Sequence, residues 1–218
     1  MLVARALSPI TIAVPKGRVT RALAPLFARA GIDPEVIVAD DRKLVRASAD
    51  GQWRFLLLKP DDVPTYVEYG AAELGISGKD VLRERGYDLY QPLDLEVGMC
   101  RLVVAGPSNR PIPAVPRVAT KYRRAATEHF ASRGVQAEVI YVQGSVEIAP
   151  LVGLADLIVD LVESGATLRD NGLVEKETIA HVSSVLVANP SLYKLRYADI
   201  EPLVTKLRAA VEQARAKS

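Results

Sequence analysis

The segment with the clearest chemistry is 156–168, DLIVDLVESGATL. An apolar run, predicted to be a strand that ends at Asp160, leads through Glu163 into a short run of small and hydroxylated residues. A helix is expected over 164–170. Small residues let backbone N–H groups approach a ligand closely, and hydroxyls and a helix start add further donors. The pattern is suited to one phosphate group, held by Ser164, Gly165, Ala166 and Thr167.

The two carboxylates in this segment narrow the choice of ligand. Asp160 and Glu163 would repel a phosphate that they faced, but they can accept hydrogen bonds from sugar hydroxyls. An acid pair beside a phosphate loop therefore indicates a phosphorylated ribose. The alternative is an ordinary strand–helix turn, in which Ser164 is the N-cap and the acids complement the helix dipole.

The surrounding elements place this segment in an α/β protein. Apolar runs of strand length alternate with stretches of helical spacing throughout the chain, which predicts a parallel α/β architecture. The expected strands are Ile10–Val14, Arg54–Leu58, Leu74–Ile76, Gly98–Ala105, Arg117–Ala119, Glu138–Val142, Asp156–Val159 and Val182–Val187. One helix is expected after Arg18 and another is expected to open at 77–80. The others are expected over 60–69, 121–133, 145–151, 164–170 and 200–216.

Composition excludes several classes of protein. The 218 residues are 49% hydrophobic and 25% charged with a net charge of +2, which excludes a disordered chain. The sequence contains no basic stripe with interleaved aromatic residues, which would indicate nucleic-acid binding. It also contains no run that is apolar enough for a membrane span. The single cysteine, Cys100, and the absence of a signal-peptide pattern in the first residues predict a cytoplasmic protein.

Several motifs in order resemble the ATP phosphoribosyltransferase family. Residues 156–173 resemble its signature, and they are preceded by GSVE at 144–147 and GLAD at 153–156. The earlier motifs are IAVPKGR at 12–18, DRKL at 41–44, KPDDVPTYV at 59–67 and LGISGKD at 74–80. Their common order over nearly the whole chain makes the resemblance specific.

The resemblance implies a glycosyl transfer. Adenine N1 of ATP would displace pyrophosphate from C1 of 5-phosphoribosyl 1-pyrophosphate (PRPP), giving N1-(5-phosphoribosyl)-ATP in the first step of L-histidine biosynthesis. Such a reaction depends on alignment of the substrates and on neutralising the leaving group. Two strongly anionic substrates imply basic side chains and Mg²⁺, with the ion held mainly by substrate phosphates.

The resemblance also assigns roles to residues. Arg18 and Arg42 match basic residues near the pyrophosphate, for which a guanidinium is suited because its planar fork binds phosphate oxygens bidentately. The loop 164–167 would bind the 5′-phosphate, and Asp160 and Glu163 the ribose hydroxyls. Lys16 is a further candidate for the pyrophosphate. The remaining candidates, for which a solvated charge on a loop or helix start is an equal alternative, are Lys59, Lys79 and Glu147.

The family's fold is a pair of α/β lobes like a type II periplasmic binding protein, with PRPP in the cleft between them. Lobe I would comprise 1–95 and 183–218 and carry the PKGR and DRKL loops. Lobe II would comprise 96–182 and carry the 5′-phosphate loop. Closure of the lobes would exclude water, which can hydrolyse the same carbon.

The length resembles the short form of the family, without the C-terminal regulatory domain of long members. Short forms work with a regulatory subunit similar to histidyl-tRNA synthetase, and a hetero-octamer is expected. Two alternatives are a non-catalytic two-lobed module that binds a phosphorylated small molecule, and a phosphoribosyltransferase with another acceptor. The second alternative gives no account of PKGR, DRKL and LGISGKD in this order.

Overall fold

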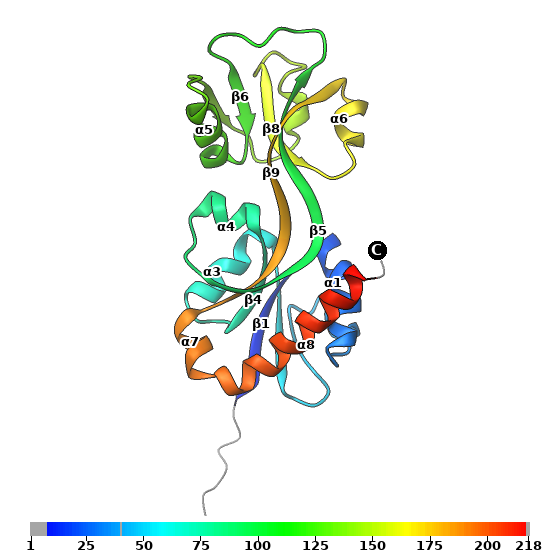
Figure 1. Cartoon of the computed structure of the whole chain (residues 1–218). Coiled ribbons are helices and arrows are strands. Elements are labelled where there is room, and N and C mark those ends of the chain that lie inside the picture. Colours follow the sequence, from blue (N-terminus) through cyan, green and yellow to red (C-terminus); the bar gives the residue numbers. More distant parts are fainter. Residues whose placement is uncertain (1–7, 40, 217–218) are drawn as a thin grey trace, which may run out of the picture. The chain divides into compact units, whose positions relative to one another are not determined.

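The computed structural model describes residues 8–39 and 41–216, and the chain divides into two compact units. Unit 1 is formed by Met1–Gly98 and Ser183–Ser218, and unit 2 by Met99–Val182. The chain passes from one unit to the other along two long strands, β5 (Tyr90–Pro107) and β9 (Leu173–Ala188), both visible in Figure 1.

Unit 1 is built on a mixed sheet in the order β2-β3-β1-β4-β9. The central strand β1 runs parallel to β3 on one side and to β4 on the other, whereas β2 and β9 run antiparallel to their neighbours. The bounds are β1 Ile10–Pro15, β2 Val45–Ala47, β3 Trp53–Leu58 and β4 Leu74–Gly78.

Helices cover both faces of this sheet, since side chains alternate between the faces along a strand. Ile12 and Val14 of β1 pack with apolar residues of α1 and α8, which lie side by side in Figure 1. Ala13 packs on the other face, against α3 and α4. The helices are α1 Arg18–Arg29, α2 Glu35–Val38, η1 Pro60–Asp62, α3 Val63–Glu68, α4 Lys79–Arg85, α7 Pro190–Leu195 and α8 Tyr197–Arg215.

Unit 2 has a smaller sheet in the order β5-β8-β6-β7. Strand β6 is parallel to both β7 and β8, and β5 is antiparallel to β8. Helix α5 covers one face, and η2 and α6 cover the other. The bounds are β6 Arg117–Thr120, α5 Arg123–Ser132, β7 Glu138–Tyr141, η2 Val146–Ile148, β8 Leu157–Val162 and α6 Ala166–Asp170.

Both units therefore reverse the strand order at an equivalent point. In unit 1 the chain goes from β1 to β3 on one side and then to β4 on the other. In unit 2 it goes from β6 to β7 and then to β8 in the same way. Open α/β sheets bind ligands outside the carboxyl ends of strands at such a reversal.

The predicted strands and the α/β fold class are confirmed, but the expectation of a parallel sheet is wrong for β2, β5 and β9. An apolar run indicates burial and does not encode strand direction. The first halves of β5 and β9 are polar, with Asp94 and Glu177 among their residues, so no apolar run marked them. In the described residues, no helix is long and apolar enough to cross a membrane.

Candidate functional site

Three lysines that were predicted to belong to the site follow three neighbouring parallel strands of unit 1. Lys16 comes directly after β1, Lys59 after β3 and Lys79 after β4. Pro15 lies opposite Leu58 in the β1–β3 pair, and the Lys16 amide N–H donates to the Leu58 carbonyl at 2.7 Å. Because the carboxyl ends of parallel strands share one edge of the sheet, the three lysines lie along that edge.

Arg42 belongs to the same edge through the antiparallel strand β2. Val45 lies opposite Leu56, and the Leu57 amide N–H donates to the Leu44 carbonyl at 2.8 Å. The segment that precedes β2 therefore reaches the edge where β3 ends. Together with Arg18, the first residue of α1, these residues form what we call the basic edge: Lys16, Arg18, Arg42, Lys59 and Lys79, all solvent-exposed.

The loop that presents Arg42 is held by its neighbour Asp41. The Asp41 carboxylate accepts hydrogen bonds from the Lys43 amide at 2.7 Å and from Arg46 at 2.8 Å. The Lys43 amide, followed by the Arg46 guanidinium, keeps the pKa of Asp41 below its usual value. Arg46 is almost fully buried and also donates to the carbonyls of Val36 and Ala39. Arg42 therefore lies between two residues, Asp41 and Lys43, that are hydrogen-bonded to each other.

The junction between β1 and α1 is open to an anion. Gly17 is the N-cap with a φ of +108°, a conformation that favours glycine, and no side chain caps the helix. The buried Thr20 hydroxyl donates to the Pro15 carbonyl at 2.6 Å and closes the turn from inside. The first turn of α1 contains no acidic residue, so its positive end adds to the charges of Lys16 and Arg18.

The acidic residues of unit 2 lie where β8 ends. The prediction that the strand ends at Asp160 is wrong, because β8 continues to Val162. Asp160 is half-buried opposite Val103, on the face of the sheet that Ile158 and Val162 share beneath η2 and α6. The strand continues because Leu161 and Val162 extend the apolar run past the carboxylate. Glu163 is exposed and is the first residue after the strand.

The 164–167 segment is a tight turn that leads into a short helix. Helix α6 begins at Ala166 and has five residues, so the expected contribution of a helix dipole is small. Ser164 is not the N-cap; Gly165 takes that place with a φ of +74°. The Ser164 hydroxyl accepts from the Ala166 amide at 3.3 Å, and Arg169 donates to the Ser164 carbonyl at 3.0 Å. The hydroxyl-bearing residues Ser164 and Thr167 are both exposed and remain candidate donors to a phosphate.

Glu147 lies in η2, in the connection that follows β7, and is half-buried. It belongs to the same edge of unit 2 as the 164–167 loop, because β7 and β8 are both parallel to β6. The structure therefore groups the predicted residues into two sets, one at the carboxyl-end edge of each unit. Asp94, which pairs with Lys79, is a residue that sequence reasoning missed.

A protein-held metal centre has no support in the described residues. Across 8–39 and 41–216, no three His, Cys, Asp or Glu side chains are grouped closely enough to hold a metal ion.

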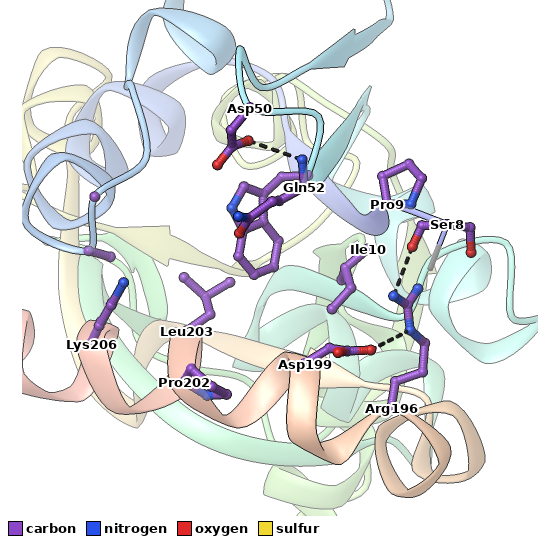
Figure 2. Close-up of a pocket in the computed structure, with 13 residues that line it drawn as sticks. Ser8, Pro9, Ile10, Asp50, Gln52, Arg196, Asp199, Pro202, Leu203 and Lys206 are labelled. Atoms are coloured by element: carbon purple, nitrogen blue, oxygen red, sulfur yellow. Dashed lines mark hydrogen bonds and ion pairs between the residues drawn. The ribbon is translucent and has the colours of Figure 1, made fainter. Parts of the chain in front are cut away.

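A cavity of about 540 Å³ lies at the other edge of the unit 1 sheet (Figure 2). Ile10 and Trp53, at the starts of β1 and β3, line it together with residues of α8. Arg196 closes one side by donating to Asp199 at 3.2 Å and to the Ser8 carbonyl at 2.8 Å. Because ligands in open α/β sheets bind at the carboxyl ends of strands, this cavity is not the candidate active site.

Comparisons with known proteins agree with the sequence motifs. The model of the HisG family, described as ATP phosphoribosyltransferase, matches residues 59–209. An ATP phosphoribosyltransferase from Sorangium cellulosum is 61% identical over 206 residues, covering 94% of this chain and 98% of the relative. One from Syntrophotalea carbinolica is 49% identical, with 94% and 96% covered.

Solved structures give the same result for the fold. A HisG:HisZ complex from Thermotoga maritima contains a chain with a TM-score of 0.80 and 34% identity, covering 94% of this chain and 99% of that chain. The periplasmic aliphatic sulphonate binding protein SsuA from Escherichia coli has a TM-score of 0.62 at 15% identity, with 96% and 75% covered. The second likeness concerns the fold alone and confirms the predicted periplasmic-binding-protein type. With 61% identity over nearly its whole length and a matching family model, the chain belongs to the ATP phosphoribosyltransferase family, the pentosyltransferases of the first step of histidine biosynthesis.

Proposed function

We propose that the two units bind opposite ends of one PRPP molecule. The basic edge, on the lobe of 1–95 and 183–218, binds the pyrophosphate. The 164–167 loop, on the lobe of 96–182, binds the 5′-phosphate. The observation that carries this proposal is the gathering of five cationic residues at the carboxyl-end edge of unit 1, where Arg18 and Arg42 lie.

The chemistry of the reaction explains why cations matter most. Adenine N1 of ATP forms a bond to C1 of PRPP while the bond from C1 to the pyrophosphate oxygen breaks. The electron pair of the breaking bond leaves with pyrophosphate, so negative charge develops there while the ribose ring becomes oxocarbenium-like. Arg18 and Arg42 stabilise that developing charge, and no side chain needs to act as a nucleophile. Lys16, Lys59 and Lys79 contribute further positive charge to the same group.

The carboxylates of unit 2 have a different task. Asp160 and Glu163 accept hydrogen bonds from the ribose 2- and 3-hydroxyls, which orients the ring so that C1 faces the adenine. Ser164, Gly165, Ala166 and Thr167 hold the 5′-phosphate with hydroxyl and amide donors, and Glu147 faces the same edge from the neighbouring connection. Carboxylates near C1 also favour an oxocarbenium-like centre electrostatically.

Mg²⁺ fits this site as an ion that binds together with the substrate. We place it on the pyrophosphate of PRPP, because the basic edge offers cations rather than oxygen ligands and the described residues contain no three-ligand acidic cluster. When bound, the ion neutralises part of the leaving group's charge. Arg18 and Arg42 then contact the remaining phosphate oxygens.

We also propose a regulatory partner. The structural relative from Thermotoga maritima was solved as a HisG:HisZ complex. By analogy, this chain associates in the cytoplasm with a subunit similar to histidyl-tRNA synthetase, in a hetero-octamer. Light scattering of the two purified proteins tests this: a complex whose mass equals four copies of each chain is expected, and separate elution would contradict it.

The direct test of the reaction is pyrophosphate release from the purified chain with ATP, PRPP and Mg²⁺, read together with the absorbance of phosphoribosyl-ATP. Adenine and GTP serve as control acceptors and should give no product. Turnover with adenine alone would contradict the assignment of the acceptor. PRPP binding without pyrophosphate release, even with the regulatory subunit present, would favour the alternative of a non-catalytic module.

A further inference from the structure

Lys79 of the basic edge has a carboxylate partner that is anchored by further residues. Its ammonium lies 2.5 Å from Oδ2 of Asp94 on β5. The same oxygen accepts a hydrogen bond from the Ser183 hydroxyl on β9 at 3.0 Å. Three separate segments of unit 1 thus meet at one carboxylate: the start of α4, β5 and β9.

Asp94 is itself fixed in place. Its second oxygen, Oδ1, accepts from the Glu96 amide at 3.0 Å. Glu96 has a φ of +55°, which is rare for a residue with a side chain, and it forms an ion pair with Arg215 of α8. Ser183 is 5% exposed. Both oxygens of Asp94 are therefore engaged, and the acceptor that Lys79 contacts has little freedom to move.

We infer that Asp94 is a positioning residue that holds the Lys79 ammonium toward the pyrophosphate of PRPP; this inference rests on the function proposed above for the basic edge. A lysine side chain has a flexible four-carbon stem, so an unheld ammonium samples many positions. An ammonium also has three N–H donors, and the pair with Asp94 does not exhaust them. Holding Lys79 at the end of β4, beside the end of β1, reduces the entropy lost when it contacts a phosphate oxygen.

The test uses inorganic pyrophosphate as the probe, with calorimetric binding to the full chain in Mg²⁺ and steady-state kinetics beside it. Asp94→Asn preserves shape and hydrogen-bond capacity but removes the charge. We expect about a tenfold weaker pyrophosphate affinity and a similar rise in the KM for PRPP, with kcat changed less than twofold. Lys79→Met should have the same effect, and the double variant should be no worse than either, because both remove one interaction.

The control is Glu175→Gln, which breaks a similarly exposed ion pair with Arg101 in unit 2 (3.0 Å) and should leave pyrophosphate affinity unchanged. A second variant, Ser183→Ala, keeps the charge of Asp94 but removes one anchor, and about a threefold loss of affinity is expected. It keeps the inference testable if Asp94→Asn folds poorly.

Three results would overturn the inference. Additive losses in the double variant would show that Asp94 and Lys79 act independently. Unchanged or tighter pyrophosphate binding by Asp94→Asn, with weaker binding by Lys79→Met, would show that Asp94 withholds Lys79 instead of presenting it. No effect of Lys79→Met while Arg18→Ala and Arg42→Ala weaken binding would remove Lys79 from the site but leave the proposed function intact. The proposed function fails separately if none of these cations affects pyrophosphate binding.

Discussion

The two units have the same strand order but different residues at its functional edge. In each unit a central strand has parallel neighbours on both sides and an antiparallel long strand beyond one of them: β3-β1-β4-β9 in unit 1 and β7-β6-β8-β5 in unit 2. The connections after β1, β3 and β4 carry the cations Lys16, Arg18, Lys59 and Lys79. In unit 2 the connection after β6 also carries cations, Lys121 and Arg123, whereas the connections after β7 and β8 carry carboxylates, hydroxyls and glycine.

The glycine turns illustrate this difference. Gly17 after β1 and Gly165 after β8 both have positive φ and both precede a helix without a side-chain cap. Gly17 is flanked by Lys16 and Arg18 and opens a helix of 12 residues; Gly165 follows Glu163 and Ser164 and opens one of five. The two glycine turns therefore share a backbone conformation but differ in the charge of their neighbours, as expected if they bind different parts of one ligand.

The largest effect is expected at the basic edge. Arg18→Ala and Arg42→Ala should each lower kcat/KM for PRPP by about 10²–10³-fold, because each removes a cation that stabilises developing charge. Both side chains are exposed, so the melting temperature should change by less than about 2 °C. Steady-state kinetics and calorimetry measure the two quantities.

Arg21→Ala is the matched control, since Arg21 is an exposed arginine one turn further along α1. Its activity should stay within about twofold of the wild type. Equal losses of activity in Arg21→Ala and Arg18→Ala would mean that the overall positive charge matters and not its position at the basic edge. Equal losses of folding and activity in Arg18→Ala or Arg42→Ala would mean that these arginines have a structural role.

A substitution at the opposite edge of the unit 1 sheet should lower the stability of the protein without changing the reaction. Arg196 bonds to Glu73 at 3.0 Å, and the two side chains are only 12% and 15% exposed. Arg196→Met would leave the Glu73 carboxylate without its counter-charge, so the free energy of unfolding should fall by about 3 kcal/mol, or roughly 6–12 °C in melting temperature. The KM for PRPP of the folded protein should be unchanged. A raised KM without loss of stability would contradict the distinction between the two edges.

A smaller effect is expected at the glycine turn of unit 2. Gly165→Ala introduces a Cβ at positive φ and within 3.2 Å of Arg169 Nη1, which costs about 1–2 kcal/mol and shifts the loop donors. The KM for PRPP should rise about tenfold. Gly153→Ala, also at positive φ but with open space around the new Cβ, should lose similar stability with no change in KM. Equal KM values for the two variants would place the 5′-phosphate elsewhere.

The smallest effect is expected at Asp156, the residue before β8, and concerns the pH dependence of stability. Asp156 accepts from the Arg117 amide at 2.9 Å, and this bond, followed by the Arg117 guanidinium, keeps the pKa of Asp156 below its usual value. A lowered folded-state pKa stabilises the protein above the unfolded value, and the contribution is lost as pH falls through the folded value. The free energy of unfolding, measured with urea between pH 2 and 6, should therefore fall less steeply with pH below about pH 4 in Asp156→Asn than in the wild type. An identical dependence in both proteins would contradict this role.

Most of the candidate site could be predicted because it is local in the sequence. The apolar runs at Ile10–Val14 and Arg54–Leu58 mark strands, and the residues that follow them must lie at the carboxyl ends. The roles assigned to those residues stay predictions until the variants are measured. Arg42 lies at the same edge only because β2 is antiparallel to β3, which no run of three residues encodes.

Other parts could not be read from the sequence. Asp94 and Ser183 are 89 residues apart and meet only because β5 and β9 pass through the same unit. The polar first half of β5 gave no strand signal, so Asp94 had no predicted neighbour. The short length of α6 also escaped prediction, because Ala166 and Thr167 are compatible with a longer helix and only the turn at Gly165 delays its start.

The most direct test of the division between the units measures two fragments of PRPP separately. Calorimetry would give the affinity for Mg²⁺-pyrophosphate and for ribose 5-phosphate in the wild type, Arg42→Ala and Thr167→Val. We expect Arg42→Ala to weaken only pyrophosphate binding and Thr167→Val to weaken only ribose 5-phosphate binding. If either variant weakened the binding of both fragments equally, or of the other fragment alone, the assignment of opposite ends of PRPP to the two units would be wrong.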